Sequence, residues 1–230
     1  KDNSYYDLLA SEARLALLVA VAKGDIPQSY WFILDRSLTE SAGGKALLSW
    51  SGTMFEYLMP LLVTRAFPPT LLSGTYEAVV KAQQIYARRR GVPWGISESA
   101  FSGVDFEKTY QYRAFGVPGL GLKRGLAEDL VISPYSTMLA LAVNARAALA
   151  NLRRLEQDGL RGEFGFYEAV DYTAERLGAE EKRHIIKSFL AHHQGMSLVS
   201  INNLLNHEIF QERFHSNPAI RACELLLQER

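Results

Sequence analysis

The chain of 230 residues carries 25 basic and 25 acidic side chains, so its formal net charge at neutral pH is zero. It lacks the broad positive field that nucleic acids and anionic membranes attract, which argues against both as partners. Its hydrophobic content of 48% suits one domain with a sizeable core, and its single cysteine, Cys223, excludes an internal disulfide and any cysteine-based zinc site.

The segment SYYDLLASEARLALLVAVAKGD predicts a first helix, with Ser4 as its N-cap and Gly24 as its end. The segment is apolar nearly all round, which is typical of a helix packed on several sides. Its apolar run from Leu15 to Ala22 is too short to span a membrane, so we expect a soluble segment without membrane insertion. Glu12 lies in the middle of this predicted helix, where a carboxylate needs either a structural ion pair or a functional role.

Residues 46–52 predict a short strand or an extended segment, and residues 53–67 predict a helix that contains Pro60. Thr70 is expected to cap a long helix over residues 71–90, which Gly91 ends. From residue 91 to residue 133 the sequence is rich in glycine and aromatic residues without a helical period. We expect little regular structure in this region and place the functional site there, because long loops in compact domains are usually functional.

Helical periodicity returns after residue 133. Pro134 predicts a helix start and Gly159 its end, residues 164–178 predict a shorter helical unit, and residues 178–207 predict one or two helices interrupted near Gly195. Residues 217–230 are predicted to be helical to the last residue. The pattern as a whole predicts an all-α fold of seven to nine helices in a single domain over residues 1–230.

Several common kinds of site are not predicted. The glycines of GVPGLGLKRG miss the dinucleotide spacing GxGxxG, so no cofactor is expected. His192 and His193 are neighbours on a predicted helix and point about 100° apart, so no metal site is expected. Together with Gln194, the two histidines either line a cleft or make ordinary hydrogen bonds at a helix end. GISES is not the GxSxG motif of a nucleophilic serine.

Carboxylates in apolar or aromatic segments are the remaining candidates. Glu98 lies between Ser97 and Ser99, where it either caps backbone amides or belongs to a site. Aromatic rings with polar edges suit the faces of sugar rings, and two carboxyl groups beside such rings are what glycoside cleavage requires. The acids of interest are Glu12, Glu56, Glu98, Glu168 and Asp171, and the aromatic residues are Trp50, Trp94, Tyr110, Tyr112, Phe115, Phe164, Phe166 and Tyr167.

A set of long motifs carries a resemblance to a known family: YYDLLASEARL, AKGDIPQSYWF, WSGTMFEYLMP, GVPWGISESAF, YQYRAFGVPGLGLKRGL, FGFYEAVDYT, AHHQGMSL and ELLLQER. In this order, over residues 5–230, they resemble the glycoamylase-like central domain of bacterial cyclic β-1,2-glucan synthases. The resemblance implies an all-α (α/α)6 toroid with its site in a cavity at one end. Seven to nine helices would form an incomplete toroid, the later part of that domain.

The resemblance also implies a function. Such a domain joins the ends of a β-1,2-glucan by retaining transglycosylation, beside other domains of a membrane-anchored synthase on the cytoplasmic side of the bacterial inner membrane. The SEARL glutamate corresponds to Glu12, the general acid/base, and the GISES glutamate to Glu98, the nucleophile. We expect a raised pKa for Glu12 in apolar surroundings and an ionised Glu98 among small polar groups.

The other residues expected to contact the glucan are Trp50, Glu56, Trp94, Ser97, Ser99, Tyr110, Tyr112, Arg113, Tyr167, Glu168, His192, His193 and Gln194. Two alternatives stay open. An endo-β-1,2-glucanase would use water as the acceptor, and a non-catalytic glucan-binding module would keep the aromatic residues without the chemistry.

Overall fold

The computed structural model describes residues 6–230, so the expected N-cap Ser4 lies outside the described residues. The described residues form nine α-helices: α1 (Ala13–Lys23), α2 (Ser29–Ile33), α3 (Met54–Leu58), α4 (Leu71–Arg90), α5 (Pro134–Leu139), α6 (Leu141–Gln157), α7 (Ala191–Leu205), α8 (Ile209–Ser216) and α9 (Pro218–Ala222). Three 3-10 turns accompany them: η1 (Met59–Leu62), η2 (Ala174–Arg176) and η3 (Glu224–Leu227). None of the described helices is long and apolar enough to cross a membrane.

The expectation of an all-α fold is wrong in one respect, because the helix-rich fold also contains small antiparallel sheets. They are the pairs β1–β2, β3–β4 and β6–β7 and the three-stranded sheet β5–β8–β9. The strands are β1 (Leu38–Ser41), β2 (Gly44–Leu47), β3 (Ser99–Val104), β4 (Tyr110–Arg113), β5 (Val131–Ile132), β6 (Arg161–Gly162), β7 (Gly165–Phe166), β8 (Ala169–Asp171) and β9 (His184–Ile186).

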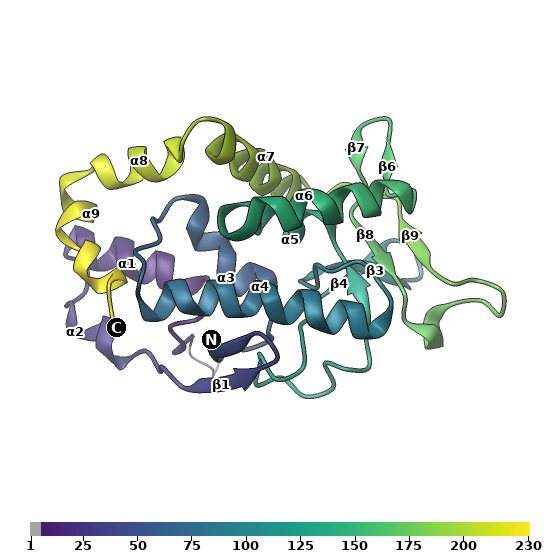
Figure 1. Ribbon diagram of the computed structural model, residues 1–230, viewed down its shortest axis with the longest axis horizontal. Coiled ribbons are helices and arrows are strands. Elements are labelled where there is room, and N and C mark those ends of the chain that lie inside the picture. The colour runs from purple at the N-terminus through teal and green to yellow at the C-terminus, as the bar shows by residue number, and fades with distance from the viewer. Residues whose placement is uncertain (1–5) are drawn as a thin grey trace.

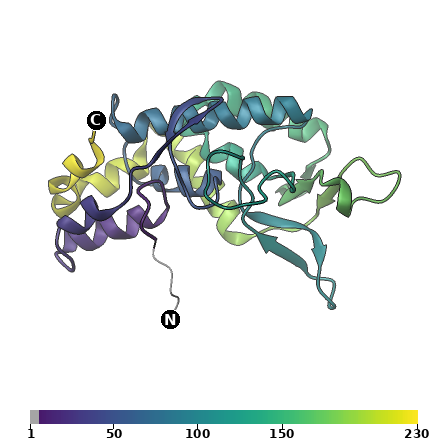
Figure 2. The same ribbon diagram turned by 90° about the horizontal axis from the view of Figure 1, so that it is seen from below.

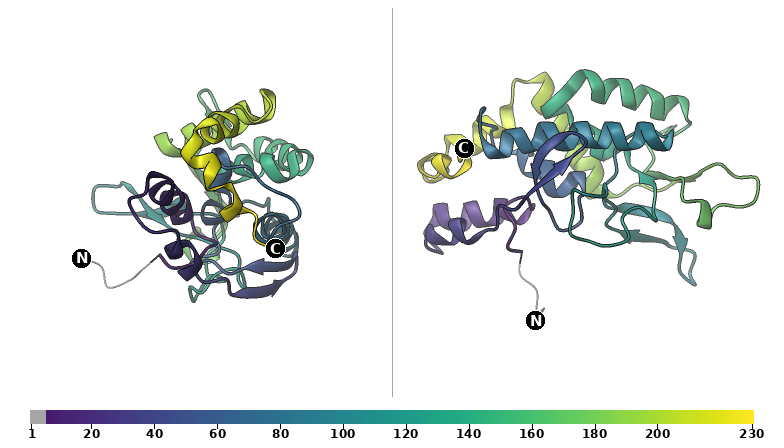
Figure 3. Two further views of the ribbon diagram at one scale, coloured as in Figure 1. Left: turned by 90° about the vertical axis from the view of Figure 1, so that its left-hand side faces the viewer. Right: turned by 60° about the horizontal axis from the view of Figure 1, so that its bottom comes forward.

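The strands from β3 onward lie toward one end of the molecule, whereas β1 lies near its middle (Figure 1). Helices α1, α8 and α9 form one end, the strands from β3 to β9 lie toward the other, and the long helix α4 runs between them beside α6. The teal β3–β4 hairpin projects from the body (Figure 2). Helix α1 packs against α9 although the two are far apart in the chain (Figure 3).

The first helix begins much later than expected, at Ala13. Residues 8–10 are buried in a non-helical segment whose Leu9 amide donates to the carbonyl oxygen of Asp35 at 3.0 Å. Only Arg14 and Leu18 of α1 are buried, so the helix is not packed on all sides within the described structure. Glu12 therefore lies at the N-terminal end of α1, where its carboxylate accepts from the Ser11 hydroxyl at 3.1 Å and lines a cavity.

Helix α4 follows its sequence prediction, because its ends are specified locally. Thr70 and Ser73 form a reciprocal capping box, and Gly91 adopts a left-handed conformation with φ of 73°. The helix also fixes the GISES segment: the Gln83 side chain donates to the carbonyl oxygen of Ile96 at 2.8 Å and accepts from its amide at 2.9 Å. This pair of bonds places Glu98, two residues later, against the body of the molecule.

The other predicted helices are shorter than expected. The 53–67 helix ends as α3 and continues only as η1, since Pro60 lacks an amide hydrogen. The 134–159 helix does start at Pro134, but it divides into α5 and α6 at Ala140. Helix α7 continues through Gly195 without interruption, and the C-terminal helical run ends before Gln228.

Residues 164–178 are not helical as expected. They form β7, β8 and η2, and β8 is the buried central strand of the sheet β5–β8–β9. The partners of β8 are Val131–Ile132 and His184–Ile186, which lie far from it in the chain. The expected irregular region over residues 91–133 likewise contains the β3–β4 hairpin and β5.

Candidate active site

A cavity of about 290 Å³ brings together several of the residues expected at the site. Glu12 comes from the start of α1, Trp50 and Glu56 from the segment around α3, and Glu98 from the residue before β3. The remaining lining residues are Tyr6, Ser51, Thr53 and Ala114. Two carboxyl groups from distant segments, Glu12 and Glu98, therefore face one space that an indole ring also borders.

The start of α1 is held in place by Arg14, which has no carboxylate partner among residues 6–230. Its guanidinium donates to the carbonyl oxygens of Ser11 at 2.8 Å, Glu56 at 2.9 Å and Tyr57 at 2.6 Å. Glu12 therefore does not form its expected structural ion pair with the nearby Arg14. Instead Arg14 fastens the segment that carries Glu12 to helix α3.

Glu56 lines the cavity, but its carboxylate is fully engaged within the protein. It accepts hydrogen bonds from the Ser49 hydroxyl at 3.0 Å, the Ser51 amide at 2.9 Å and the Thr53 amide at 2.9 Å. Burial raises the pKa of Glu56, and these hydrogen bonds oppose that effect. The structure gives Glu56 a clear role in shaping the wall of the cavity that bears Trp50.

Glu98 has a fixed backbone and a sparsely bonded carboxyl group. The Tyr135 hydroxyl lies 2.8 Å from its carbonyl oxygen, and the Tyr112 hydroxyl donates to its Oε2 at 3.2 Å. Burial raises the pKa of Glu98 to about 7; the Tyr112 hydrogen bond lowers it, and the carboxylates of Glu12 and Glu56 raise it further. The expectation that small polar neighbours keep Glu98 ionised is therefore wrong, because Ser97 and Ser99 do not bond its carboxyl group.

This raised pKa predicts how stability depends on pH. Folded Glu98 binds its proton more tightly than unfolded Glu98 does, so its contribution is complete below pH 4.5 and is lost as the pH rises through about 7. We expect Glu98→Gln to be more stable than the unchanged chain at pH 8 by about 2 kcal/mol, with no such gain at pH 4. Urea unfolding at both pH values measures this, with the exposed Glu77→Gln as the control; equal differences at the two pH values would contradict it.

A second group of expected residues lies directly behind Glu98. Glu168 and His193 are both buried, and the Nδ1 atom of His193 is 2.8 Å from Oε1 of Glu168. The Tyr112 hydroxyl lies 3.3 Å from Nε2 of His193, and the exposed His192 ring lies 4.0 Å from the His193 ring. Glu168 and His193 do not line the cavity, so the structure does not support direct contact of either with a glucan there.

Trp94 does not belong to this cavity, contrary to expectation. Its ring is 8% exposed, and it lines a different hollow between α4 and α6. The side chain of Asn151 bonds both its amide, at 3.1 Å, and its carbonyl oxygen, at 2.7 Å. The Pro-Trp-Gly turn therefore packs into the core and supports the loop that carries Glu98.

The other expected contacts have structural surroundings outside the cavity lining. Ser97 and Ser99 are fully buried, and Ser97 Oγ accepts from the Phe55 amide at 3.0 Å. Arg113 pairs with Asp129 at 3.0 Å. Three others contact groups elsewhere: the Tyr110 ring lies 6.4 Å from the His184 ring, the Tyr167 ring lies 5.5 Å from the Phe189 ring, and Gln194 Nε2 donates to the Phe166 carbonyl oxygen at 3.4 Å. Asp171, an acid of interest outside the expected glucan contacts, pairs with Arg176 at 2.8 Å.

Two residues that shape the site had no sequence signal of their own. Arg14 adjoins Glu12, but only the structure shows that it bonds backbone carbonyls of α3. Tyr135 follows the helix-starting Pro134 and reaches Glu98 from another element. Among residues 6–230, no three or more His, Cys, Asp and Glu side chains are grouped to hold a metal ion.

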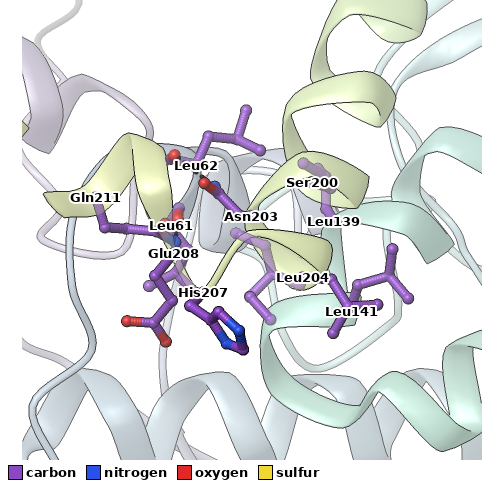
Figure 4. A pocket seen from close by; sticks show the side chains of 12 residues that line it. Leu61, Leu62, Leu139, Leu141, Ser200, Asn203, Leu204, His207, Glu208 and Gln211 are labelled. Atoms are coloured by element: carbon purple, nitrogen blue, oxygen red, sulfur yellow. Dashed lines mark hydrogen bonds between the residues drawn. The ribbon is translucent and has the colours of Figure 1, made fainter. Parts of the chain in front are cut away.

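Another cavity, of about 250 Å³, lies between η1, α5 and the α7–α8 turn (Figure 4). Six leucines line it together with the polar residues Ser200, Asn203, His207, Glu208 and Gln211. A single carboxyl group, that of Glu208, lines it. It therefore lacks the pair of acids that distinguishes the cavity of Glu12 and Glu98.

Comparison with known proteins places the chain in a family. The model of the Glycoamylase family, described as "Putative glucoamylase", matches residues 4–218. The chain is 48% identical over 229 residues to cyclic beta-(1,2)-glucan synthase NdvB of Rhizobium meliloti (strain 1021), and it spans 8% of that protein's length.

Solved structures share the fold at low sequence identity. A "putative glucoamylase" from Bacteroides caccae superposes with a TM-score of 0.67 at 19% identity, covering 95% of this chain and 54% of that one. An endo-beta-1,2-glucanase from Chitinophaga pinensis, in complex with sophorotriose and glucose, superposes with a TM-score of 0.67 at 16% identity, covering 98% and 54%. The match over most of its residues and the shared helix-rich fold show that this chain belongs to the Glycoamylase family.

Proposed function

We propose that this chain acts on β-1,2-glucan and closes it into a ring by retaining transglycosylation. The observation that carries the proposal is the convergence of Glu12 and Glu98 on one cavity beside Trp50. Cleavage of a glycosidic bond requires two carboxyl groups on either side of it and an apolar surface for the sugar ring. The glucan substrate is inferred from the printed functions of NdvB and of the Chitinophaga pinensis glucanase.

The proposed reaction has two displacements. Ionised Glu98 attacks the anomeric carbon, and the glycosidic bond breaks as Glu12 gives its proton to the leaving sugar oxygen. Glu12, now ionised, takes the proton of the hydroxyl group at the far end of the same glucan. That oxygen attacks the anomeric carbon, Glu98 leaves, and the β linkage is restored in a closed ring.

The acid with a pKa of about 7 is Glu98, so close to half of it is ionised at neutral pH in the free chain. A nucleophile has to be ionised when it attacks, so the site needs a way to favour the charged form of Glu98. The role proposed for Glu12, that of a proton donor which then becomes a base, stays a prediction.

The proposal includes a larger setting. We infer that the chain is part of an (α/α)6 toroid within a membrane-anchored synthase, on the cytoplasmic side of the inner membrane and beside that synthase's other domains. Its 48% identity to a segment of NdvB supports this setting. In this view, helices contributed by the rest of the toroid complete the glucan-binding surface.

Hydrolysis is the second candidate, because the fold is shared with an endo-β-1,2-glucanase. The cavity has the same carboxyl pair in either case, and the acceptor makes the difference: a sugar hydroxyl in cyclisation and water in hydrolysis. Mass spectrometry after incubation with linear β-1,2-glucan separates the two reactions. The sample is the parent protein, that is, the larger synthase of which we infer this chain to be a part. We expect rings that lack the mass of one water relative to the linear glucan; shorter linear chains alone would favour hydrolysis.

A further inference from the structure

An unbroken chain of contacts leads from Glu98 into the core. The Tyr112 hydroxyl is 3.2 Å from Oε2 of Glu98 and 3.3 Å from Nε2 of His193. On the far side of the imidazole ring, Nδ1 is 2.8 Å from Oε1 of Glu168. Four side chains from four separate segments are thus joined in one line: residue 98 before β3, β4, α7 and residue 168 before β8.

Glu168, at the buried end of this line of contacts, has few hydrogen-bond partners for its carboxyl group. Glu168 is 2% exposed; its Oε1 also accepts from the Ala100 amide at 3.3 Å, and its Oε2 has no partner within the described residues. A positive charge on a neighbouring group stabilises a buried carboxylate with so few hydrogen bonds, and the imidazole of His193 is placed to carry that charge once it gains a proton. The Tyr135 ring stacks on that imidazole with centroids 3.6 Å apart and planes at 11°, which fixes its orientation.

We propose that Tyr112, His193 and Glu168 form a relay that receives the proton of Glu98 when this carboxyl group ionises. The O–H bond of Glu98 breaks as its proton passes to the Tyr112 oxygen. The hydroxyl proton of Tyr112 passes in turn to Nε2 of His193. The resulting imidazolium stays paired with the Glu168 carboxylate, and Tyr112 ends as a neutral hydroxyl that donates to ionised Glu98.

The relay keeps the total charge of the line unchanged. Before transfer Glu168 alone is charged; after transfer the line holds two carboxylates and one imidazolium. The relay therefore ionises Glu98 by moving its proton along the line, and the charges end up paired through hydrogen bonds. In this role Tyr112, His193 and Glu168 are positioning residues that act through Glu98, rather than the sugar-binding residues that the sequence suggested.

Other groups around Glu98 do not supply this charge. Glu12 and Glu56 face it with carboxylates, which disfavour its ionisation. His192 lies over Tyr112 at 6.2 Å between ring centroids, and burial and its neighbour His193 lower the pKa of His192. No arginine or lysine forms an ion pair with Glu98 within residues 6–230. His193 is thus the cationic partner within reach through Tyr112.

The test measures the protonation of Glu98 and His193 and needs neither glucan nor turnover. Its outcome is therefore independent of the proposed function. Only the role of the relay in catalysis rests on that function. Carboxyl carbon and imidazole nitrogen NMR signals of Glu98 and His193 are recorded against pH in the 230-residue chain. We expect the two groups to titrate together in two shared steps. A His193 that keeps one neutral tautomer throughout the titration of Glu98 would overturn the relay.

Variants separate the relay from a merely structural contact. Tyr112→Phe, at a side chain that is 45% exposed, removes only the linking hydroxyl, and we expect it to raise the pKa of Glu98 by about one unit and to uncouple His193. Tyr110→Phe, two residues along the same strand, is the matched control and should change neither. Glu168→Gln should also raise the pKa of Glu98, although the Tyr112 contact remains. An unchanged Glu98 titration in Tyr112→Phe would contradict the proposal.

Discussion

Glu98→Gln in the parent protein is expected to lower the rate of β-1,2-glucan turnover by about four orders of magnitude or more. Glutamine matches the shape of the side chain and its contact with Tyr112, but it cannot form the glycosyl-enzyme by attack on the anomeric carbon. Because the change removes a group needed in the transition state, kcat should fall while KM changes little. Initial rates over a range of glucan concentrations measure both constants.

The control for this prediction is Glu77→Gln, which removes an exposed carboxylate of α4 that does not line the cavity. It should retain the activity of the unchanged protein. Far-UV circular dichroism and the urea midpoint establish that the Glu98 variant is folded. A folded Glu98→Gln protein that turns over glucan within tenfold of the control would show that Glu98 is not the nucleophile.

Arg14→Met is expected to lower the free energy of unfolding by about 3 to 5 kcal/mol, because three buried carbonyl oxygens lose their donor. Arg14 is 3% exposed, and its guanidinium is shared by backbone carbonyl oxygens of Ser11, Glu56 and Tyr57. In a helix the carbonyl oxygen of Glu56 would accept from the amide four residues later. That residue is Pro60, which has no amide hydrogen, so Arg14 supplies the donor. Methionine fills the volume but leaves these buried oxygens without a donor.

Urea unfolding of the 230-residue chain tests the Arg14 prediction, with Arg146→Met at an exposed position of α6 as the control. Arg14→Lys separates charge from geometry. Its single ammonium cannot reach the carbonyls that two guanidinium nitrogens reach, so most of the loss should remain. A loss below about 1 kcal/mol in Arg14→Met, or full recovery in Arg14→Lys, would contradict this account of the anchor.

The parts of the fold that the sequence predicted well are those specified within one or two turns of chain. Helix α4 is the clearest, since Thr70, Ser73 and Gly91 fix its ends through bonds to their immediate neighbours. Pro134 marks a helix start for the same local reason. Strand β8 could not be predicted in this way, because it exists through pairing with β5 and β9, which belong to separate segments of the chain.

At the site, too, features set by nearby sequence could be predicted, and features set by tertiary packing could not. The pairing of Glu12 with Glu98 came from family motifs, and the fold brings both to one cavity. Whether a residue faces that cavity depended on tertiary packing: Trp94 turns into the core on Asn151, while Trp50 borders the cavity. The raised pKa of Glu98 arises mainly from burial, which its serine neighbours in the sequence could not reveal.

The central claim, that Glu98 is the nucleophile and Glu12 the acid/base at the same sugar bond, has a direct chemical test. Glu98→Ala and Glu12→Ala in the parent protein are supplied with azide and a β-linked aryl sophoroside, and the glycosyl azide formed is identified by proton NMR. Azide replacing Glu98 attacks once from the opposite face and should give the α-azide. With Glu12 removed, azide attacks the glycosyl-enzyme on Glu98 and should give the β-azide. A β-azide from Glu98→Ala, or no azide product from either variant, would contradict the assignment.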